Sequence, residues 1–229
     1  MLRSSGVVAC MKEPIGPPRL SGRREQAARN DERILSAARE VFITDAEAPI
    51  SAVAARAGVG ISAIYRRWPG KEDLLRQLCA DGLRHYVEVA EAALADDGDA
   101  WQAFARFLRR IVEADVHSLT VRLAGTFRPT DEMFADGRRA DELNDRLVKR
   151  TKRAGVLRPD IRAEDLALIL EQVTAIRPGV FGDDARTAQL RQRYLALILD
   201  GLRSETAKLP GTPPSAEELL RRWIPPKRR

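Results

Sequence analysis

A run of basic and hydroxyl side chains in the first third of the chain is suited to binding a polyanion. Between Ser51 and Lys71 the chain carries four basic residues and no acidic one. Arginine and lysine bind phosphate groups, and arginine also recognises the edges of bases in a DNA groove. The hydroxyls of Ser51 and Tyr65 are further donors to phosphate oxygens. These residue types predict a protein that binds nucleic acid.

Two short helices are expected to position these side chains. The first is predicted at residues 52–57, with Ser51 as its N-cap, and the second at residues 61–67. Glycine-containing breaks at residues 58–60 and 68–70 end the two helices. Two short helices joined by a three-residue turn that contains glycine are typical of a helix-turn-helix motif.

A small apolar core is expected to hold these helices against an earlier one. The earlier helix is predicted to begin with Asn30 or Asp31 as its N-cap, and its apolar residues recur on one face as far as Phe42. Apolar residues of the motif lie at spacings that close this core: Ile50, Val53, Ala54, Ala57, Val59 and Ile64. The remaining residues of the second short helix then face outward, and a helix fits the major groove of B-DNA.

The outward side chains are assigned to two kinds of DNA contact. Those near helix starts would hold phosphates, and those of the second short helix would read bases. The predicted DNA-binding residues are Ser51, Gly60, Ile61, Ser62, Ala63, Tyr65, Arg66, Arg67 and Lys71. Tyr65 has a simpler interpretation as a core aromatic, and Arg66 and Arg67 as a solvated face. Gly58, Gly60 and Ala63 also mimic a dinucleotide fingerprint, but that motif requires a preceding strand.

The same segment resembles a known family. The stretch ISAVAARAGVGISAIYRRWPGKEDLL, Ile50–Leu75, is similar to the DNA-binding domain of the TetR family of helix-turn-helix transcriptional repressors. The similarity spans about residues 31–78 and depends on Ala54, Ala57, Gly58, Val59, Tyr65, Pro69, Lys71, Glu72 and Leu74. Trp68 stands where an aromatic residue is expected. Gly60 departs from a frequent serine, and Ile61 from a polar or basic residue, so Ile61 could contact a thymine methyl.

The resemblance implies an all-α fold with an N-terminal three-helix helix-turn-helix DNA-binding domain and a C-terminal helical ligand-binding and dimerisation domain. The expected division is a disordered basic tail at 1–30, the DNA-binding domain at 31–78, a linking helix at 71–94, the regulatory and dimerisation domain at 79–204, and a C-terminal tail with a short helix at 205–229. Helices near 163–176 and 184–203 carry more apolar residues than one covered face needs, which predicts a homodimer.

An apolar pocket is predicted in the larger domain, because aromatic residues gather there in a chain that is only 5% aromatic. The expected ligand-binding residues are Trp101, Phe104, Phe107, His117, Arg122, Phe127, Met133, Phe134 and Gln172. Core packing is the simpler and favoured explanation of the spacing of Trp101, Phe104 and Phe107. The predicted partner of this pocket is a small apolar or amphipathic effector.

Composition limits the remaining classes of function. The two cysteines and two histidines are too few for a disulfide framework or a metal site, so no metal and no cofactor are expected. The chain has no run of 18 apolar residues and no apolar signal core, which favours a cytoplasmic protein without a membrane partner. The net charge of +6 comes from the tails, since residues 31–220 sum to −3.

The favoured interpretation is a ligand-responsive repressor that binds a palindromic double-stranded operator as a dimer and is released by a small-molecule effector. An architectural DNA-binding protein without an effector is an alternative, although it would not need about 130 residues behind its reading domain. An all-α enzyme is the other, although the motifs HExxH, CxxC and G-x-S-x-G are absent from the sequence.

Overall fold

The structure is a computed structural model of the 229-residue chain that describes residues 22–177, 179–180, 182–203 and 209–223. The helices are α1 (Gly22–Thr44), α2 (Ile50–Ala57), α3 (Ile61–Arg67), α4 (Lys71–Ala95), α5 (Ala100–Glu113), α6 (Val116–Leu123), α7 (Asp131–Arg153), α8 (Ala163–Thr174), α9 (Asp184–Arg203) and α10 (Ala216–Leu220), followed by a 3₁₀ turn at Arg221–Trp223. The described residues contain no β-strand, so the predicted all-α fold is confirmed.

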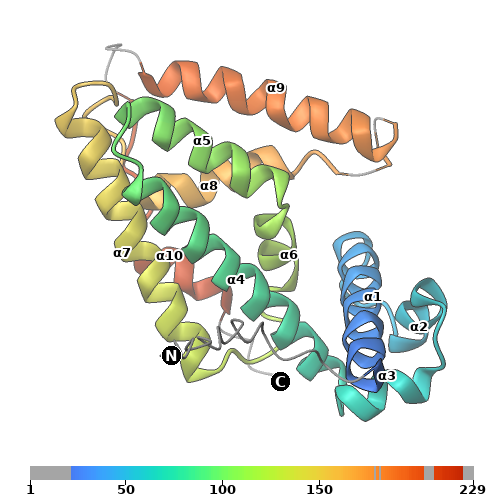
Figure 1. Ribbon diagram of the computed structural model, residues 1–229. Helices are drawn as coiled ribbons and strands as arrows, with labels where there is room; N and C mark the ends of the chain where they lie inside the picture. The colour runs from blue at the N-terminus through green and yellow to red at the C-terminus, as the bar shows by residue number, and fades with distance from the viewer. Residues whose placement is uncertain (1–21, 178, 181, 204–208, 224–229) are drawn as a thin grey trace, which may run out of the picture.

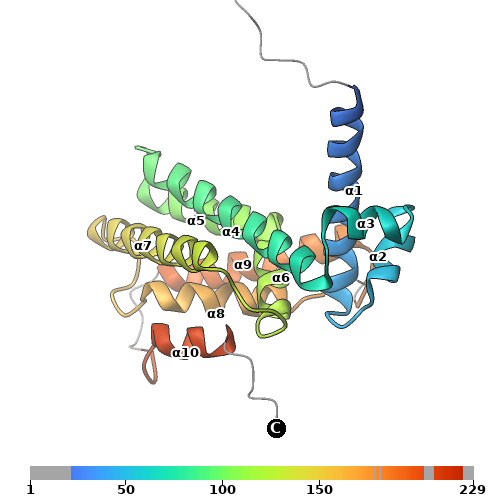
Figure 2. The ribbon, with the colours of Figure 1, turned by 90° about the horizontal axis from the view of Figure 1, so that it is seen from below.

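The long helix α4 joins two groups of helices (Figure 1). Helices α1, α2 and α3 gather at its N-terminal end, while α5, α7, α8 and α9 lie along the rest of it or behind it. Figure 2 shows the same division from below, with α10 on the opposite side of α8 from α4. Because α4 has 25 residues, it spans about 37 Å at 1.5 Å per residue.

The core of the small N-terminal group is built from the residues that the spacing predicted. Ile34, Phe42, Val53 and Ile64 are completely buried there. The same cluster continues into the larger group through Leu119 and Leu123 of α6, Phe127, Met133 and the partly buried Trp223. The two groups therefore share apolar packing at their junction and do not meet only through α4.

The core of the larger group is a second cluster centred on α5. Trp101, Phe104 and Phe107 are all buried in it, and Phe107 meets Tyr86 of α4 edge to face at 5.5 Å between ring centroids. The hydroxyl of Tyr86 donates to Asn144 at 2.8 Å, and burial raises the pKa of this phenol. The aromatic spacing seen in the sequence thus serves mainly to fill a core.

Three predicted helix boundaries are wrong. Helix α1 begins at Gly22, so the expectation of disorder to residue 30 and of a cap at Asn30 or Asp31 fails for residues 22–30, while residues 1–21 lie outside the described part. Residues 24–29 of this extension are exposed, so no apolar period marks them. Helix α2 begins at Ile50 after Pro49, which places Ser51 inside the first turn. The sequence pattern also predicts helices at about 100–117 and 119–126, whereas α5 ends at Glu113 and α6 begins at Val116.

Candidate nucleic-acid interface

The turn between α2 and α3 is set by a glycine in a left-handed conformation. Gly58 has φ 64° and ψ 39°, and the amides of Gly58 and Val59 donate to the carbonyls of Ala55 and Ala54. Arg33 of α1 donates to the Ala57 carbonyl at 2.7 Å, and a Cβ on Gly58 would lie 3.4 Å from its guanidinium. Because other residues are strained at this φ, glycine fixes the direction in which α3 leaves the turn.

Helix α3 is anchored on one side and exposed on the other. Ile64 has no exposed surface, and Trp68, which follows the helix, is 6% exposed. On the other side Ile61 and Tyr65 are 43% and 47% exposed, although both are large and apolar or aromatic. Ser62, Arg66 and Arg67 are also exposed, and Ala63 is half-buried. This is the arrangement of a helix that presents one face to a large partner.

The basic residues of this region are not equivalent. Arg67 donates to Asp31 of α1 at 3.0 Å and its guanidinium lies 5.8 Å from the Trp68 ring centroid, so it holds α3 to α1. Arg56 is paired with Glu40. Within the described part of the chain Arg66 has no ion-pair partner, which leaves its charge available to DNA. Sequence spacing could not separate these roles, because both acidic partners come from α1.

The predicted phosphate contacts lie at the two helix starts. Ser51 is exposed in the first turn of α2. Lys71 is the first residue of α4, is half-buried, and has its ammonium 5.4 Å from the centroid of the Phe42 ring. Gly60 precedes α3 with an extended backbone and supplies no side-chain cap. Every residue assigned to DNA from the sequence except Ala63 and Lys71 is thus exposed.

The residues predicted to form a ligand pocket are not brought together. Trp101, Phe104 and Phe107 belong to the large core, whereas Phe127 and Met133 belong to the cluster of the small group. Phe134 is 40% exposed, Gln172 is exposed and His117 is half-buried. Arg122 donates to the Thr44 carbonyl at the end of α1, so it joins α6 to the small group.

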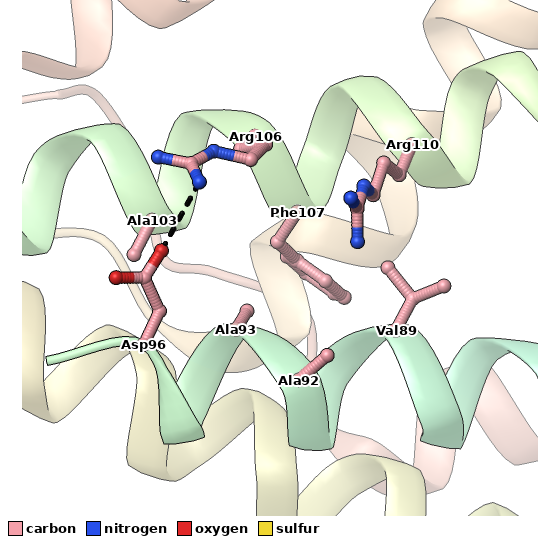
Figure 3. A pocket seen from close by; sticks show the side chains of 8 residues that line it. All are labelled: Val89, Ala92, Ala93, Asp96, Ala103, Arg106, Phe107 and Arg110. Carbon is pink, nitrogen blue, oxygen red and sulfur yellow. Dashed lines mark ion pairs between the residues drawn. The ribbon is translucent and has the colours of Figure 1, made fainter. Parts of the chain in front are cut away.

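A hollow that the sequence did not indicate lies between α4 and α5. Its volume is about 140 Å³, and Figure 3 shows it lined by α4 residues such as Ala92 and Ala93 and by Arg106, Phe107 and Arg110 of α5. Phe107 is the one member of the predicted set that lines it. Alanines create the space, and alanine in a helix carries no sequence signal for a cavity.

The described residues contain little that suits catalysis. Burial raises the pKa of the Cys79 thiol to about 12, so it is not a thiolate nucleophile at neutral pH. No group of three or more His, Cys, Asp or Glu side chains among them could hold a metal ion. No helix among them is both long and apolar enough to cross a membrane.

Comparison with known proteins assigns both halves of the chain. Residues 34–78 match the family model described as bacterial regulatory proteins, tetR family, and residues 99–204 match the C-terminal domain described as transcriptional regulator SbtR-like. The chain is 32% identical over 143 residues to the HTH-type transcriptional repressor LfrR of Mycolicibacterium smegmatis, an alignment that covers 61% of this chain and 71% of LfrR.

Solved structures agree with this assignment. A TetR transcription regulatory protein from Mycobacterium vanbaalenii is 27% identical with a TM-score of 0.51, over 79% of this chain and 99% of that one. The crystal structure of LfrR in complex with proflavine, from Mycobacterium smegmatis, has a TM-score of 0.57 at 22% identity, over 80% of this chain and 99% of that one. At that identity the second likeness concerns the fold alone.

Proposed function

Because this chain belongs to the tetR family of bacterial regulatory proteins, we propose that it is a ligand-responsive transcriptional repressor that binds a near-palindromic operator as a homodimer. The observation that carries the proposal is the exposed face of α3, on a helix anchored by the buried Ile64. Two copies of α3, one from each subunit, would enter successive major grooves about 34–36 Å apart. This function places the protein in the bacterial cytoplasm, where operator DNA lies.

The proposed contacts divide into two kinds. Ser51, Tyr65 and Lys71 bind phosphates of the DNA backbone. Such contacts set the register of the dimer on the DNA but do not distinguish one base sequence from another. Ile61, Ser62 and Arg66 read bases, because they are exposed on α3 itself. Arg67, which is tied to Asp31, positions α3 and makes a weaker contribution to sequence choice.

Phosphate and base contacts are distinguishable by substitution. Lys71→Ala and Tyr65→Phe should weaken binding by the same factor on operator and random duplex, and Lys71→Ala should reduce the slope of log affinity against log salt by about one. Arg66→Ala should cost about 1–3 kcal/mol on operator and little at random sequence. The measurement is a salt series of fluorescence anisotropy titrations, on an operator selected from random duplexes and on its scrambled form. If Lys71→Ala changed base preference, or if Arg66→Ala weakened both duplexes equally, the proposed placement of α3 would be wrong.

The proposed dimer interface lies on α8 and α9. Leu168 of α8 and Tyr194 and Leu197 of α9 are 38%, 49% and 60% exposed, while Leu166, Leu170, Leu195 and Leu199 of the same helices are buried. Two helices with apolar residues on both faces are typical of a four-helix bundle formed with a partner subunit. Covering this surface would also set the distance between the two copies of α3.

A charge on this surface should separate the subunits. Leu197→Arg buries an unpaired guanidinium in the proposed interface, and we expect the dimer dissociation constant to rise at least thirtyfold, about 2 kcal/mol. Light scattering and sedimentation at micromolar concentration measure the oligomeric state. Operator affinity should fall as the dimer dissociates. Leu209→Arg is the matched control, since Leu209 is 44% exposed outside α8 and α9 and should leave the dimer intact. A Leu197→Arg variant that remained dimeric would refute the interface.

The effector response is proposed to act through α4 and α6. Helix α4 runs from the regulatory helices into the DNA-binding domain, and Arg122 of α6 bonds the carbonyl of Thr44 at the end of α1. The crystal structure of LfrR, a relative of this chain, is a complex with proflavine, which supports a response of this chain to a small-molecule ligand. A ligand releases the operator only if it binds more tightly to a conformation in which the two reading helices are misplaced.

A further inference from the structure

The hollow between α4 and α5 combines an apolar floor with a positively charged rim. Phe107 is buried and points from α5 toward α4, where the small side chains of Ala92 and Ala93 leave space (Figure 3). Arg106 and Arg110 lie four residues apart on α5, so both guanidinium groups reach the same side of that helix. Both arginines are exposed, which makes the hollow accessible from solvent.

The charges around the hollow do not balance. Arg106 pairs with Asp96, which ends α4, at 3.2 Å between Nη1 and Oδ2. Asp96 is the acidic residue among those that line the hollow. Within the described part of the chain Arg110 has no ion-pair partner. The hollow therefore carries one uncompensated positive charge beside an apolar surface.

We propose that this hollow binds a small carboxylate with a flat apolar body, of the size of benzoate. The volume of about 140 Å³ is close to the roughly 150 Å³ of an engineered cavity that accepts benzene. The ring lies over Phe107 and the alanines, and the carboxylate accepts hydrogen bonds from Arg110 at the open rim. A guanidinium suits this task because its planar donors match the two oxygens of a carboxylate.

The position of the hollow connects ligand binding to the end of α4. Arg150 of α7 donates to the carbonyls of Ala93 and Leu94 at 3.1 and 3.3 Å, which fixes the last turn of α4 from one side. The Arg106–Asp96 pair fixes it from the α5 side. A carboxylate held by Arg110 also reaches Arg106, one helical turn away on α5, where it competes with Asp96 and so loosens α4 from α5. This regulatory part rests on the proposed function, whereas the binding site itself does not.

Calorimetry on the purified full-length protein tests the site with benzoate as the probe and benzamide as its neutral match. We expect benzoate to bind and benzamide to bind at least tenfold more weakly, because the charged hydrogen bond is lost. Arg110→Gln should weaken benzoate at least tenfold, and Ala92→Leu should abolish binding by filling the hollow. Arg109→Gln is the matched control, since Arg109 is exposed on α5 but does not line the hollow, and it should leave benzoate affinity unchanged.

Circular dichroism establishes that each variant is folded, and Ala92 is exposed, so its substitution does not disturb the core. Equal affinity for benzoate and benzamide, or unchanged benzoate binding by Arg110→Gln and Ala92→Leu, would overturn the site. A separate titration of operator DNA with and without benzoate tests the regulation, and unchanged operator affinity at saturating benzoate would overturn that part. Absence of operator binding without any ligand would instead contradict the proposed function, while the calorimetric result would still decide the site.

Discussion

Ile64→Asp should strongly destabilise the DNA-binding domain, whereas Ile61→Asp in the same helix should not. Ile64 has no exposed surface and packs in the cluster that contains Phe42 and Val53, while Ile61 is 43% exposed. Ile64→Asp removes an apolar anchor and buries a carboxylate for which the cluster offers no positive partner. The combined cost should be at least about 3 kcal/mol, a large part of a typical total stability of 5–15 kcal/mol.

Thermal melts followed by circular dichroism measure this difference. A loss of about 3 kcal/mol should lower the Tm by about 6–12 °C if the whole chain unfolds as one unit. Hydrogen exchange should locate the loss in α1, α2 and α3. Ile61→Asp should keep the Tm within about 2 °C, because exposed substitutions usually change stability by less than 0.5 kcal/mol. Both variants should lose operator binding, the second through repulsion between its carboxylate and DNA. An unchanged Tm for Ile64→Asp would mean that α3 is not anchored as described.

Helix α3 of the helix-turn-helix could be predicted from the sequence because local residue types mark both of its ends. Helix α3 has the predicted bounds, since glycine-containing triplets break the chain on both sides of it. Helix α9 also begins and ends where the sequence indicated. By contrast, the start of α1 was missed, because residues 24–29 of this helix are exposed and bury no apolar face. Helical residues that pack against nothing leave no periodic signal.

The proposed ligand site was not predictable for a different reason. Trp101, Phe104 and Phe107 recur on one helical face whether they line a pocket or fill a core, and here they fill a core. The hollow arises where alanines of α4 face α5, and sequence spacing does not show which small residues meet across two helices. The same limit hid the pairing of Arg67 with Asp31, which are 36 residues apart. Long-range pairings of this kind decide the role of each arginine.

A buried ion pair between α9 and the start of α6 is the second place where a large effect is expected. Arg191 of α9 is 5% exposed and pairs with Asp115 at 2.8 Å. Its Nε donates to the Ile176 carbonyl just after α8 at 2.9 Å. Asp115 lies between α5 and α6 with φ 49°, the left-handed region, and accepts a hydrogen bond from Ser118 of α6. Arg191 thus ties the proposed dimer helix to the start of α6.

Removing both partners of this pair should cost clearly less than the sum of the two single removals. Arg191→Met leaves the Asp115 carboxylate, only 20% exposed, without its cation, and should cost about 3–5 kcal/mol. Asp115→Asn leaves the buried guanidinium unpaired, although asparagine is compatible with the left-handed backbone. The double variant should cost at least about 1.5 kcal/mol less than the sum of the single costs, because no isolated charge remains.

Urea unfolding at a fixed protein concentration measures this cycle, since dimer formation would otherwise shift the apparent stability. Arg186→Met is the matched control, because Arg186 is an exposed arginine of α9 and should change stability by less than 0.5 kcal/mol. Since α6 also carries Arg122, which bonds the Thr44 carbonyl, Arg191→Met should weaken operator binding even at temperatures where the protein is folded. Strictly additive single costs would show that Arg191 and Asp115 do not act as a pair, and an unchanged operator affinity would show that α6 does not transmit their loss to α1.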